Sequence, residues 1–117
     1  METQSIVNTS SGNVCGFREN DVFKFYGIPY AKPPVNELRW REPQKFTWEN
    51  TIKCDKFSSI CHQIPNMPFI YRKDYSMSED CLYLNIWTSS FERKKPVIFW
   101  IHGGGFMRGA GSLPVYD

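Results

Sequence analysis

One short stretch near the end of the sequence most constrains the fold. Residues 97–101 read Val-Ile-Phe-Trp-Ile and are followed at once by His102 and three consecutive glycines, Gly103 to Gly105. An uninterrupted apolar run of this length is typical of a strand that is buried on both faces of a parallel sheet. We therefore expect a buried strand at 97–101 that ends in a glycine loop.

The glycine loop can bring bare backbone close to a ligand. Glycine has no Cβ and tolerates positive φ, so its N–H groups can approach a bound group closely. N–H groups presented in this way stabilise negative charge that develops on an oxygen during a reaction. The spacing excludes a dinucleotide-binding loop, because Arg108 stands where the third glycine would be. It also excludes a P-loop, because Ala110 follows Gly109 where a lysine is required.

The sequence contains no visible nucleophile to accompany these N–H groups. The Gly-x-Ser-x-Gly pattern, in which a strand–turn–helix exposes a reactive serine, occurs nowhere in the 117 residues. Only two histidines are present, His62 and His102, and the second opens the glycine loop itself. The sequence therefore holds part of a transition-state binding site, and we expect the chain to be a fragment of a larger catalytic unit.

Composition and charge exclude several classes of partner. The net charge is +2, from 14 basic and 12 acidic residues that are scattered along the chain, so neither nucleic acid nor an anionic membrane is expected to bind. No segment has the apolar length of a membrane span, and the residues after Met1 do not resemble a signal peptide. Two interpretations of the compartment stay open: the protein is intracellular, or residues that precede Met1 in a longer protein are missing from this sequence.

The four cysteines do not by themselves decide between a disulfide framework and free thiols. Cys15, Cys54, Cys61 and Cys81 permit three complete pairings, and four free, partly buried thiols are the alternative. If Cys61 and Cys81 were joined, the bridge would stabilise the fold by about 3 kcal/mol. No pair of cysteines or histidines has the spacing of a zinc site, so neither a metal nor an organic cofactor is expected.

Short strands and loops account for most of the chain. Alternating or apolar segments predict strands at 14–17, 22–26 and 82–87, besides the one at 97–101. Three prolines make 27–34 a stiff loop, residues 36–40 can form one helical turn, and 44–80 are expected to be irregular.

The predicted elements include no helix that could cover the strand at 97–101. Parallel strands normally receive this cover from crossover helices, so we expect the covering helices to lie beyond Asp117. The isolated chain should then expose an edge at 97–101 and be poorly soluble.

Four sequence blocks, taken together, resemble a known family. In order along the chain they are 27–34 (GIPYAKPP), 38–40 (LRW), 78–86 (SEDCLYLNI) and 102–106 (HGGGF). In this order and spacing the blocks are similar to type-B carboxylesterases, the cholinesterase-like branch of the α/β-hydrolases. The resemblance implies an α/β fold in which residues 1–117 form the N-terminal portion of a single, incomplete domain.

The resemblance also implies roles for the glycine loop. In this family the second and third glycines of the HGGG block, here Gly104 and Gly105, donate backbone N–H groups to the oxyanion that forms during acyl transfer. A third N–H comes from the residue after the nucleophilic serine, which this sequence lacks. The family's catalytic base lies near the far C-terminus, so His102 is expected to order the loop by hydrogen bonding.

Two structural pairs follow from the same resemblance. The cysteine of the EDC block pairs with one upstream, which predicts a disulfide between Cys61 and Cys81 and leaves the other two cysteines free. An arginine and a glutamate form a salt bridge in the family, here Arg39 and Glu79. We expect this pair to be buried, so that breaking it would cost about 3–5 kcal/mol.

The resemblance predicts a serine ester hydrolase that acts on small carboxylic esters without a cofactor. Cholinesterases carry a tryptophan in the first disulfide loop, where it stacks on a quaternary ammonium. This sequence has Phe69, Tyr71 and Tyr75 between Cys61 and Cys81 but no tryptophan, which favours apolar esters over choline esters. The alternative is a catalytically inactive adhesion or binding protein of the same fold, such as the neuroligins.

Overall fold

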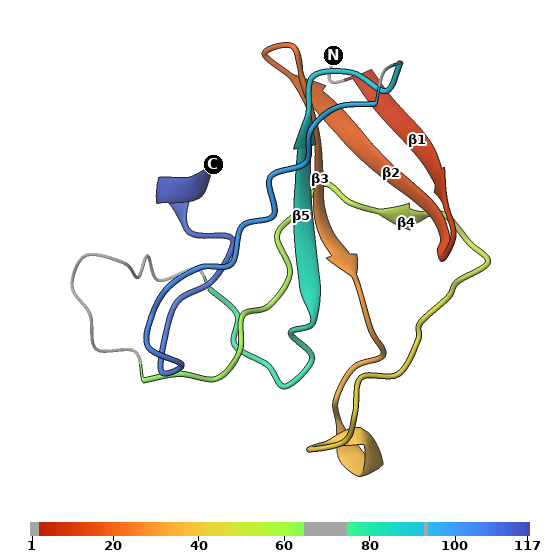
Figure 1. Ribbon diagram of the computed structural model, residues 1–117. Helices are drawn as coiled ribbons and strands as arrows, with labels where there is room; N and C mark the ends of the chain where they lie inside the picture. Colours follow the sequence, from red (N-terminus) through yellow and green to blue (C-terminus); the bar gives the residue numbers. More distant parts are fainter. Residues whose placement is uncertain (1–2, 65–74, 93) are drawn as a thin grey trace.

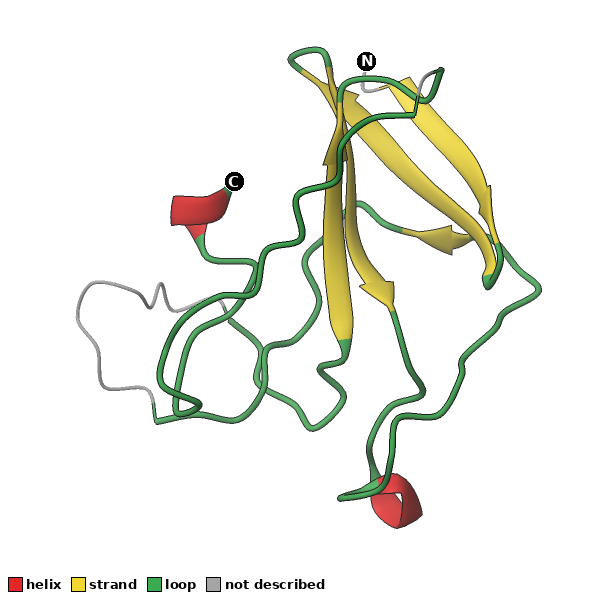
Figure 2. Ribbon diagram, in the orientation of Figure 1, coloured by secondary structure: helices red, strands yellow, loops and turns green. Residues whose placement is uncertain are grey.

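The computed structural model describes residues 3–64, 75–92 and 94–117, and a single sheet dominates this part of the chain (Figure 1). Its five strands are β1 (Thr3–Thr9), β2 (Gly12–Glu19), β3 (Val22–Pro29), β4 (Ile52–Lys53) and β5 (Tyr83–Thr88). The strand order is β1-β2-β3-β5, and the short β4 pairs with β2 in parallel. The remaining described residues are loops and two 3-10 turns, η1 (Asn36–Leu38) and η2 (Pro114–Tyr116), as Figure 2 shows.

The first three strands form an antiparallel meander with tight turns. Val7 lies opposite Val14 across β1 and β2, and Phe17 lies opposite Lys24 across β2 and β3. The second turn consists of Asn20 and Asp21, both with positive φ, which is the backbone twist that two-residue hairpin turns favour. The predicted hairpin between 14–17 and 22–26 is therefore confirmed, with longer strands than expected.

Strand β5 returns from far along the sequence to pair with β3. The pairing is antiparallel and is interrupted by a bulge at Tyr26 and Gly27, where Gly27 has a φ of 68°. The N–H groups freed by the bulge are not lost: Tyr26 N donates to Cys54 O (2.9 Å) and Gly27 N donates to Asn85 Oδ1 (2.9 Å). The predicted strand at 82–87 is confirmed, whereas the predicted loop at 27–34 begins later, because 27–29 still belong to β3.

The main core is built from strands β2 and β3 and from Cys54, the residue that follows β4. Four side chains are buried there, Val14, Phe25, Ile28 and Cys54, and partly buried neighbours pack around them. A second, smaller cluster joins Ile60 to Ala110 and Leu113 and lies away from the sheet. The region predicted as irregular, 44–80, thus supplies β4 to the sheet and Ile60 to this second cluster.

The prediction of a buried strand at 97–101 is wrong for this structure. These residues are in no strand, and their side chains are between 63% and 91% exposed. The physical reason is the lack of a neighbour, because no described residue pairs with their backbone, and an apolar run becomes a strand only by pairing. The expected exposure of 97–101 is present, without an ordered edge.

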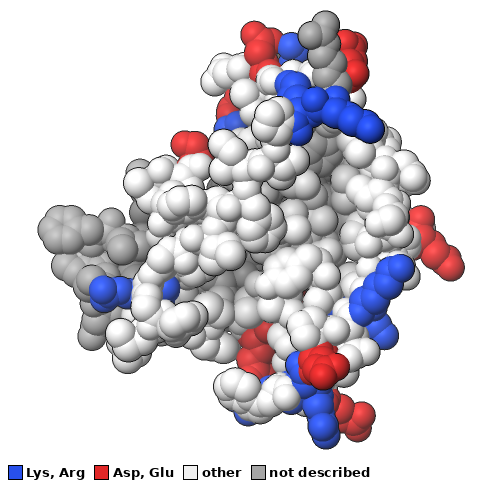
Figure 3. Space-filling view, in the orientation of Figure 1, with Lys and Arg blue, Asp and Glu red and all other residues white. Residues whose placement is uncertain are grey.

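No helix among the described residues is long and apolar enough to cross a bilayer. Charged side chains of both signs lie around the edge of the face drawn in Figure 3, and the broad middle of this face carries few of them. Both signs occur side by side on this face, as the near balance of 14 basic and 12 acidic residues leads one to expect.

Candidate functional site

The glycine loop adopts a tight turn that depends on positive φ. Met107 N donates to Gly104 O (3.1 Å), which closes a four-residue turn. Its central residues, Gly105 and Phe106, have φ values of 61° and 60°, and Gly104 before them has a φ of 137°. Glycine adopts these values without strain, whereas Phe106 does so at a cost, so the loop shape is set by the run of glycines.

The N–H groups of Gly104 and Gly105 are available to a ligand. Neither donates to an acceptor within the part of the chain that the structure describes, and neither belongs to a strand ladder. A side chain built on Gly105 would meet open space, so this part of the loop is not covered. Both predicted oxyanion residues therefore present unpaired donors, which is the property that oxyanion binding requires.

The two arms of the loop lie back to back, with no room for side chains between them. A Cβ on Gly104 would lie 1.8 Å from Arg108 O, and a Cβ on Gly109 would lie 2.5 Å from Gly103 O. Gly109 also faces the His102 ring, because the same Cβ would lie 2.7 Å from His102 Nδ1. The glycines at 104 and 109 are thus required by close backbone approach.

His102 belongs to the loop's internal contacts. Its Nδ1–H donates to Gly103 O (2.9 Å), and the ring lies against Gly109. Among the described residues His102 forms no ion pair with a carboxylate, the group that would orient a catalytic histidine. These contacts fit the expected ordering role, which stays a prediction.

Side chains from the middle of the sequence hold the second half of the loop region, residues 108–117, which we call the returning arm. Gln63 pairs with both backbone groups of Gly109, and Tyr75 Oη donates to Ser112 O (3.3 Å). Figure 1 shows the blue returning arm beside the green chain around residue 60, in agreement with the cluster of Ile60 and Ala110. Sequence reasoning missed Gln63, because a single polar residue in an irregular segment carries no periodic signal.

Asp117 ties the end of this arm to the sheet. Its Oδ1 accepts from Tyr26 Oη (2.9 Å), Trp87 Nε1 (3.0 Å) and Lys24 Nζ (3.2 Å). Burial raises the pKa of this carboxyl, but the donors from Trp87, Tyr26 and Lys24 outweigh it and leave the pKa below the ordinary value. Sequence reasoning also missed this contact, which joins residues about ninety positions apart.

Arg39 and Glu79 form an ion pair, but at the surface. Arg39 Nε donates to Glu79 Oε1, and the two side chains are 54% and 41% exposed. The guanidinium also lies 5.2 Å from the centre of the Trp40 ring. The expectation that breaking this pair would strand a buried charge is therefore wrong, because water solvates both groups and exposed pairs contribute about 0–1 kcal/mol.

All four cysteines are free thiols in the structure, so the bridge expected between Cys61 and Cys81 is not formed. The two thiols are nonetheless close enough to interact: burial raises the pKa of Cys81, and the charge of Cys61 raises it further. Cys54 is fully buried in the sheet core, where burial raises its pKa to about 11. The pairing of Cys61 with Cys81 stays a prediction.

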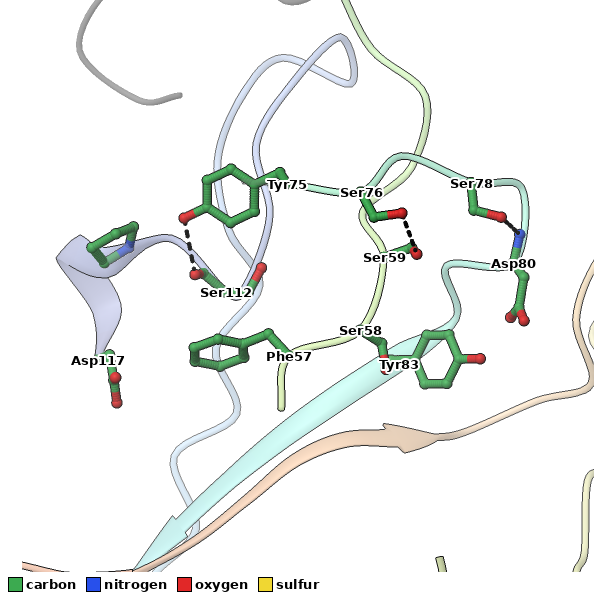
Figure 4. A pocket seen from close by; sticks show the side chains of 11 residues that line it. Phe57, Ser58, Ser59, Tyr75, Ser76, Ser78, Asp80, Tyr83, Ser112 and Asp117 are labelled. Atoms are coloured by element: carbon green, nitrogen blue, oxygen red, sulfur yellow. Dashed lines mark hydrogen bonds between the residues drawn. The ribbon is translucent and has the colours of Figure 1, made fainter. Parts of the chain in front are cut away.

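One hollow among the described residues does not contain the predicted oxyanion residues, Gly104 and Gly105. It has a volume of about 640 Å³ and is shown in Figure 4, with Ser59, Ser76 and Asp80 among its lining residues. Two of its hydroxyls bond to each other, Ser59 Oγ and Ser76 Oγ (3.2 Å), and no histidine lines it. The hollow therefore has no histidine to activate a serine, and the described residues hold no group of three side chains suited to a metal ion.

Comparisons with known proteins agree on one family. Residues 3–117 match the carboxylesterase family. The chain is 44% identical to a para-nitrobenzyl esterase of Bacillus subtilis, over 98% of this chain and 24% of that protein. It is 40% identical to an acetylcholinesterase of Danio rerio, over 99% of this chain and 21% of that protein.

Solved structures give the same result. A para-nitrobenzyl esterase structure superposes with a TM-score of 0.91 at 42% identity, covering 98% of this chain and 24% of that one. A carboxylesterase of Geobacillus stearothermophilus superposes with a TM-score of 0.83 at 40% identity, covering 96% and 22%. The chain thus spans about a quarter of the length of the relatives it matches.

Proposed function

This chain belongs to the carboxylesterase family, and on that premise we propose that it supplies the oxyanion-binding backbone of a serine carboxylic-ester hydrolase. Its sheet has the fold of the N-terminal part of an α/β-hydrolase esterase. In the proposal, residues 1–117 are the N-terminal portion of one catalytic domain. The nucleophilic serine, its histidine base and the acid that orients this histidine come from residues outside 1–117.

The proposed reaction is acyl transfer through a covalent intermediate. The serine oxygen attacks the ester carbonyl while the histidine takes its proton, and negative charge moves onto the carbonyl oxygen. The N–H groups of Gly104 and Gly105 donate to this oxygen, together with the N–H that follows the serine. The histidine then protonates the leaving alcohol, and water releases the acid by the same steps.

One observation carries the proposal: the N–H groups of Gly104 and Gly105 have no acceptor within the described structure. Such donors are costly to leave unpaired unless water or a ligand satisfies them. Each donor to a developing oxyanion contributes about 10²- to 10³-fold in rate, so a loop that keeps two of them unpaired is suited to this task.

We propose apolar carboxylic esters as the substrate class. Phe106 and Met107 are exposed beside the N–H donors, where they can contact an apolar acyl or alcohol group. The segment between Cys61 and Cys81 has no tryptophan for a quaternary ammonium; Phe69 and Tyr71 of this segment lie outside the described residues. The Tyr75 hydroxyl is engaged by Ser112 O, which favours a structural role for this ring.

The test is an ester-hydrolysis assay on the full-length protein that contains these residues. We expect turnover of p-nitrophenyl acetate and butyrate, little turnover of acetylthiocholine, and covalent labelling of one serine by a fluorophosphonate. Residues 1–117 alone should not exceed the buffer rate. Turnover by residues 1–117, or a full-length protein that neither hydrolyses esters nor accepts the label, would refute the proposal. The second outcome would favour a non-catalytic binding protein.

A further inference from the structure

One side chain outside the glycine loop bonds to both backbone groups of a loop residue. Gln63 Oε1 accepts from Gly109 N (2.7 Å), and Gln63 Nε2 donates to Gly109 O (3.1 Å). The two residues are 46 positions apart in the sequence. A primary amide that pairs with one residue's N–H and C=O replaces the two hydrogen bonds that a neighbouring strand would make.

Gly109 in turn fixes the start of the loop. It lies so close to Gly103 O and to the His102 ring that a Cβ could not fit between them. The preceding residue, Arg108, places its carbonyl against Gly104 in the same way. Because the backbone of one arm is packed directly against the backbone of the other, a shift of Gly109 would displace Gly103 and Gly104 as well.

The segment that carries Gln63 is itself held in place by hydrogen bonds and by apolar contacts. Its Nε2 also donates to Cys61 O (3.1 Å), which orients the amide. Ile60, three residues before Gln63, forms two backbone hydrogen bonds with residues 76–78: Ile60 N donates to Ser76 O (2.9 Å), and Ser78 N donates to Ile60 O (3.0 Å). The Ile60 side chain is buried against Ala110 and Leu113, so the same segment holds the returning arm by apolar contact as well.

We propose that Gln63 is a positioning residue for the oxyanion site. By pairing with both backbone groups of Gly109, it holds the two arms of the glycine loop together and keeps the N–H groups of Gly104 and Gly105 in place for the substrate oxygen. This inference rests on the proposed function, and Gln63 acts through Gly109 without touching the ester.

The test compares two matched substitutions in the full-length protein. Gln63→Met keeps the length of the side chain and removes both hydrogen bonds to Gly109. Gln44→Met is the control, because Gln44 is an exposed glutamine whose Nε2 donates to Glu42 O (3.0 Å), away from the loop. Gln63→Glu is a third variant, which keeps the acceptor for Gly109 N and loses the donor to Gly109 O.

We expect Gln63→Met to lower kcat for p-nitrophenyl acetate by about 10- to 100-fold with little change in KM. A misplaced N–H donor reduces the stabilisation of the transition state more than it reduces the binding of the substrate. Affinity for a trifluoromethyl ketone, which forms an oxyanion adduct, should fall by the same factor. Gln63→Glu should lose at least as much, because one oxygen of its carboxylate would face the carbonyl oxygens of Gly109 and Cys61, and Gln44→Met should match the unmodified protein. Equal kcat in Gln63→Met and Gln44→Met, or a loss confined to KM, would overturn the proposal.

Amide hydrogen exchange separates failure of this inference from failure of the proposed function. Gly109 N–H should exchange at least about tenfold faster in Gln63→Met than in Gln44→Met, because its acceptor is gone. Unchanged exchange at Gly109 would overturn the role of Gln63 whatever the activity. Faster exchange at Gly109, in a protein that hydrolyses no ester, would support the role of Gln63 in holding the loop and refute the esterase.

Discussion

The sheet and the glycine loop are stabilised in different ways. In the sheet, consecutive strands β1, β2 and β3 pair through short turns, β5 completes the row, and Val14 and Phe25 are buried beneath it. Residues 97–113 have no strand pairing in the described structure. Their apolar run at 97–101 is exposed, and contacts from Gln63 and Tyr75 hold the returning arm.

The difference follows from where each region finds its partners. A meander needs only the next few residues to satisfy its backbone, because each strand turns back onto the last. A strand of the kind predicted at 97–101 needs neighbours on both edges and cover on both faces. The described residues supply the neighbours that the meander needs, but they supply no strand partner for residues 97–101. The following predictions test this contrast, from the largest expected effect to the smallest.

Removing a core ring from the sheet should have the largest effect. Phe25 is 3% exposed, so Phe25→Ala should lower the free energy of unfolding by about 3–5 kcal/mol through lost burial and a cavity. Ile6, on the outer strand of the same sheet, is largely exposed, and Ile6→Ala should change it by less than about 0.5 kcal/mol. Urea denaturation at low protein concentration measures both. Equal effects would mean that the sheet core is elsewhere.

Adding one methyl group to the loop should abolish most activity. A Cβ on Gly104 would collide with Arg108 O, so Gly104→Ala should displace a donor and lower kcat by about 10²- to 10³-fold. A Cβ on Gly103 would meet nothing within 4 Å, and Gly103→Ala is the matched control. Ester hydrolysis by the full-length protein is the readout. A loss in Gly103→Ala as large as in Gly104→Ala would contradict the assignment.

The cysteine buried in the sheet core and the two cysteines outside this core, Cys61 and Cys81, should behave differently. Under oxidising conditions we expect a bridge between Cys61 and Cys81, with a stabilisation of about 3 kcal/mol that Cys61→Ser removes. Under reducing conditions, iodoacetamide at mildly alkaline pH should modify the exposed Cys61 and spare Cys54, because burial raises the pKa of that thiol to about 11. Peptide mapping by mass spectrometry identifies both products. A bridge that contains Cys54 would contradict this prediction.

The exposed apolar run should limit the solubility of residues 1–117 on their own. Ile98 is 91% exposed and Trp100 is 63% exposed, so the chain should associate through these side chains. Replacing both with lysine should raise the soluble fraction by a few-fold without changing the circular dichroism of the sheet. Sedimentation of expressed protein measures the fraction. A soluble, cooperatively melting monomer without the substitutions would contradict the prediction.

The surface ion pair should have the smallest effect. A double-mutant cycle on Arg39→Ala and Glu79→Ala should give a coupling energy below about 1 kcal/mol, since both side chains are largely solvated. The cycle also separates this coupling from the contact of Arg39 with Trp40. A coupling energy of about 3 kcal/mol or more would show that the pair is buried in the full-length protein.

The parts of the fold that depend on local pattern could be predicted. Alternation of apolar and polar residues located β2, β3 and β5, and the HGGGF block located the loop that presents N–H groups. The contacts of Gln63 and Asp117 could not be predicted, since each joins segments that are distant in the sequence and neither residue has a distinctive pattern. Exposure of Arg39 and Glu79 was also missed, because a pairing motif does not report burial.

The sequence by itself determined the hairpin of β2 and β3, the family and the residues whose backbone can meet an oxyanion, because turn chemistry, side-chain alternation and the glycine run act over short distances. Only the tertiary structure decided which side chains hold the glycine loop and whether the run at 97–101 is covered. The reason is physical: burial and pairing are properties of neighbours in space, and a stretch of chain does not contain its own neighbours.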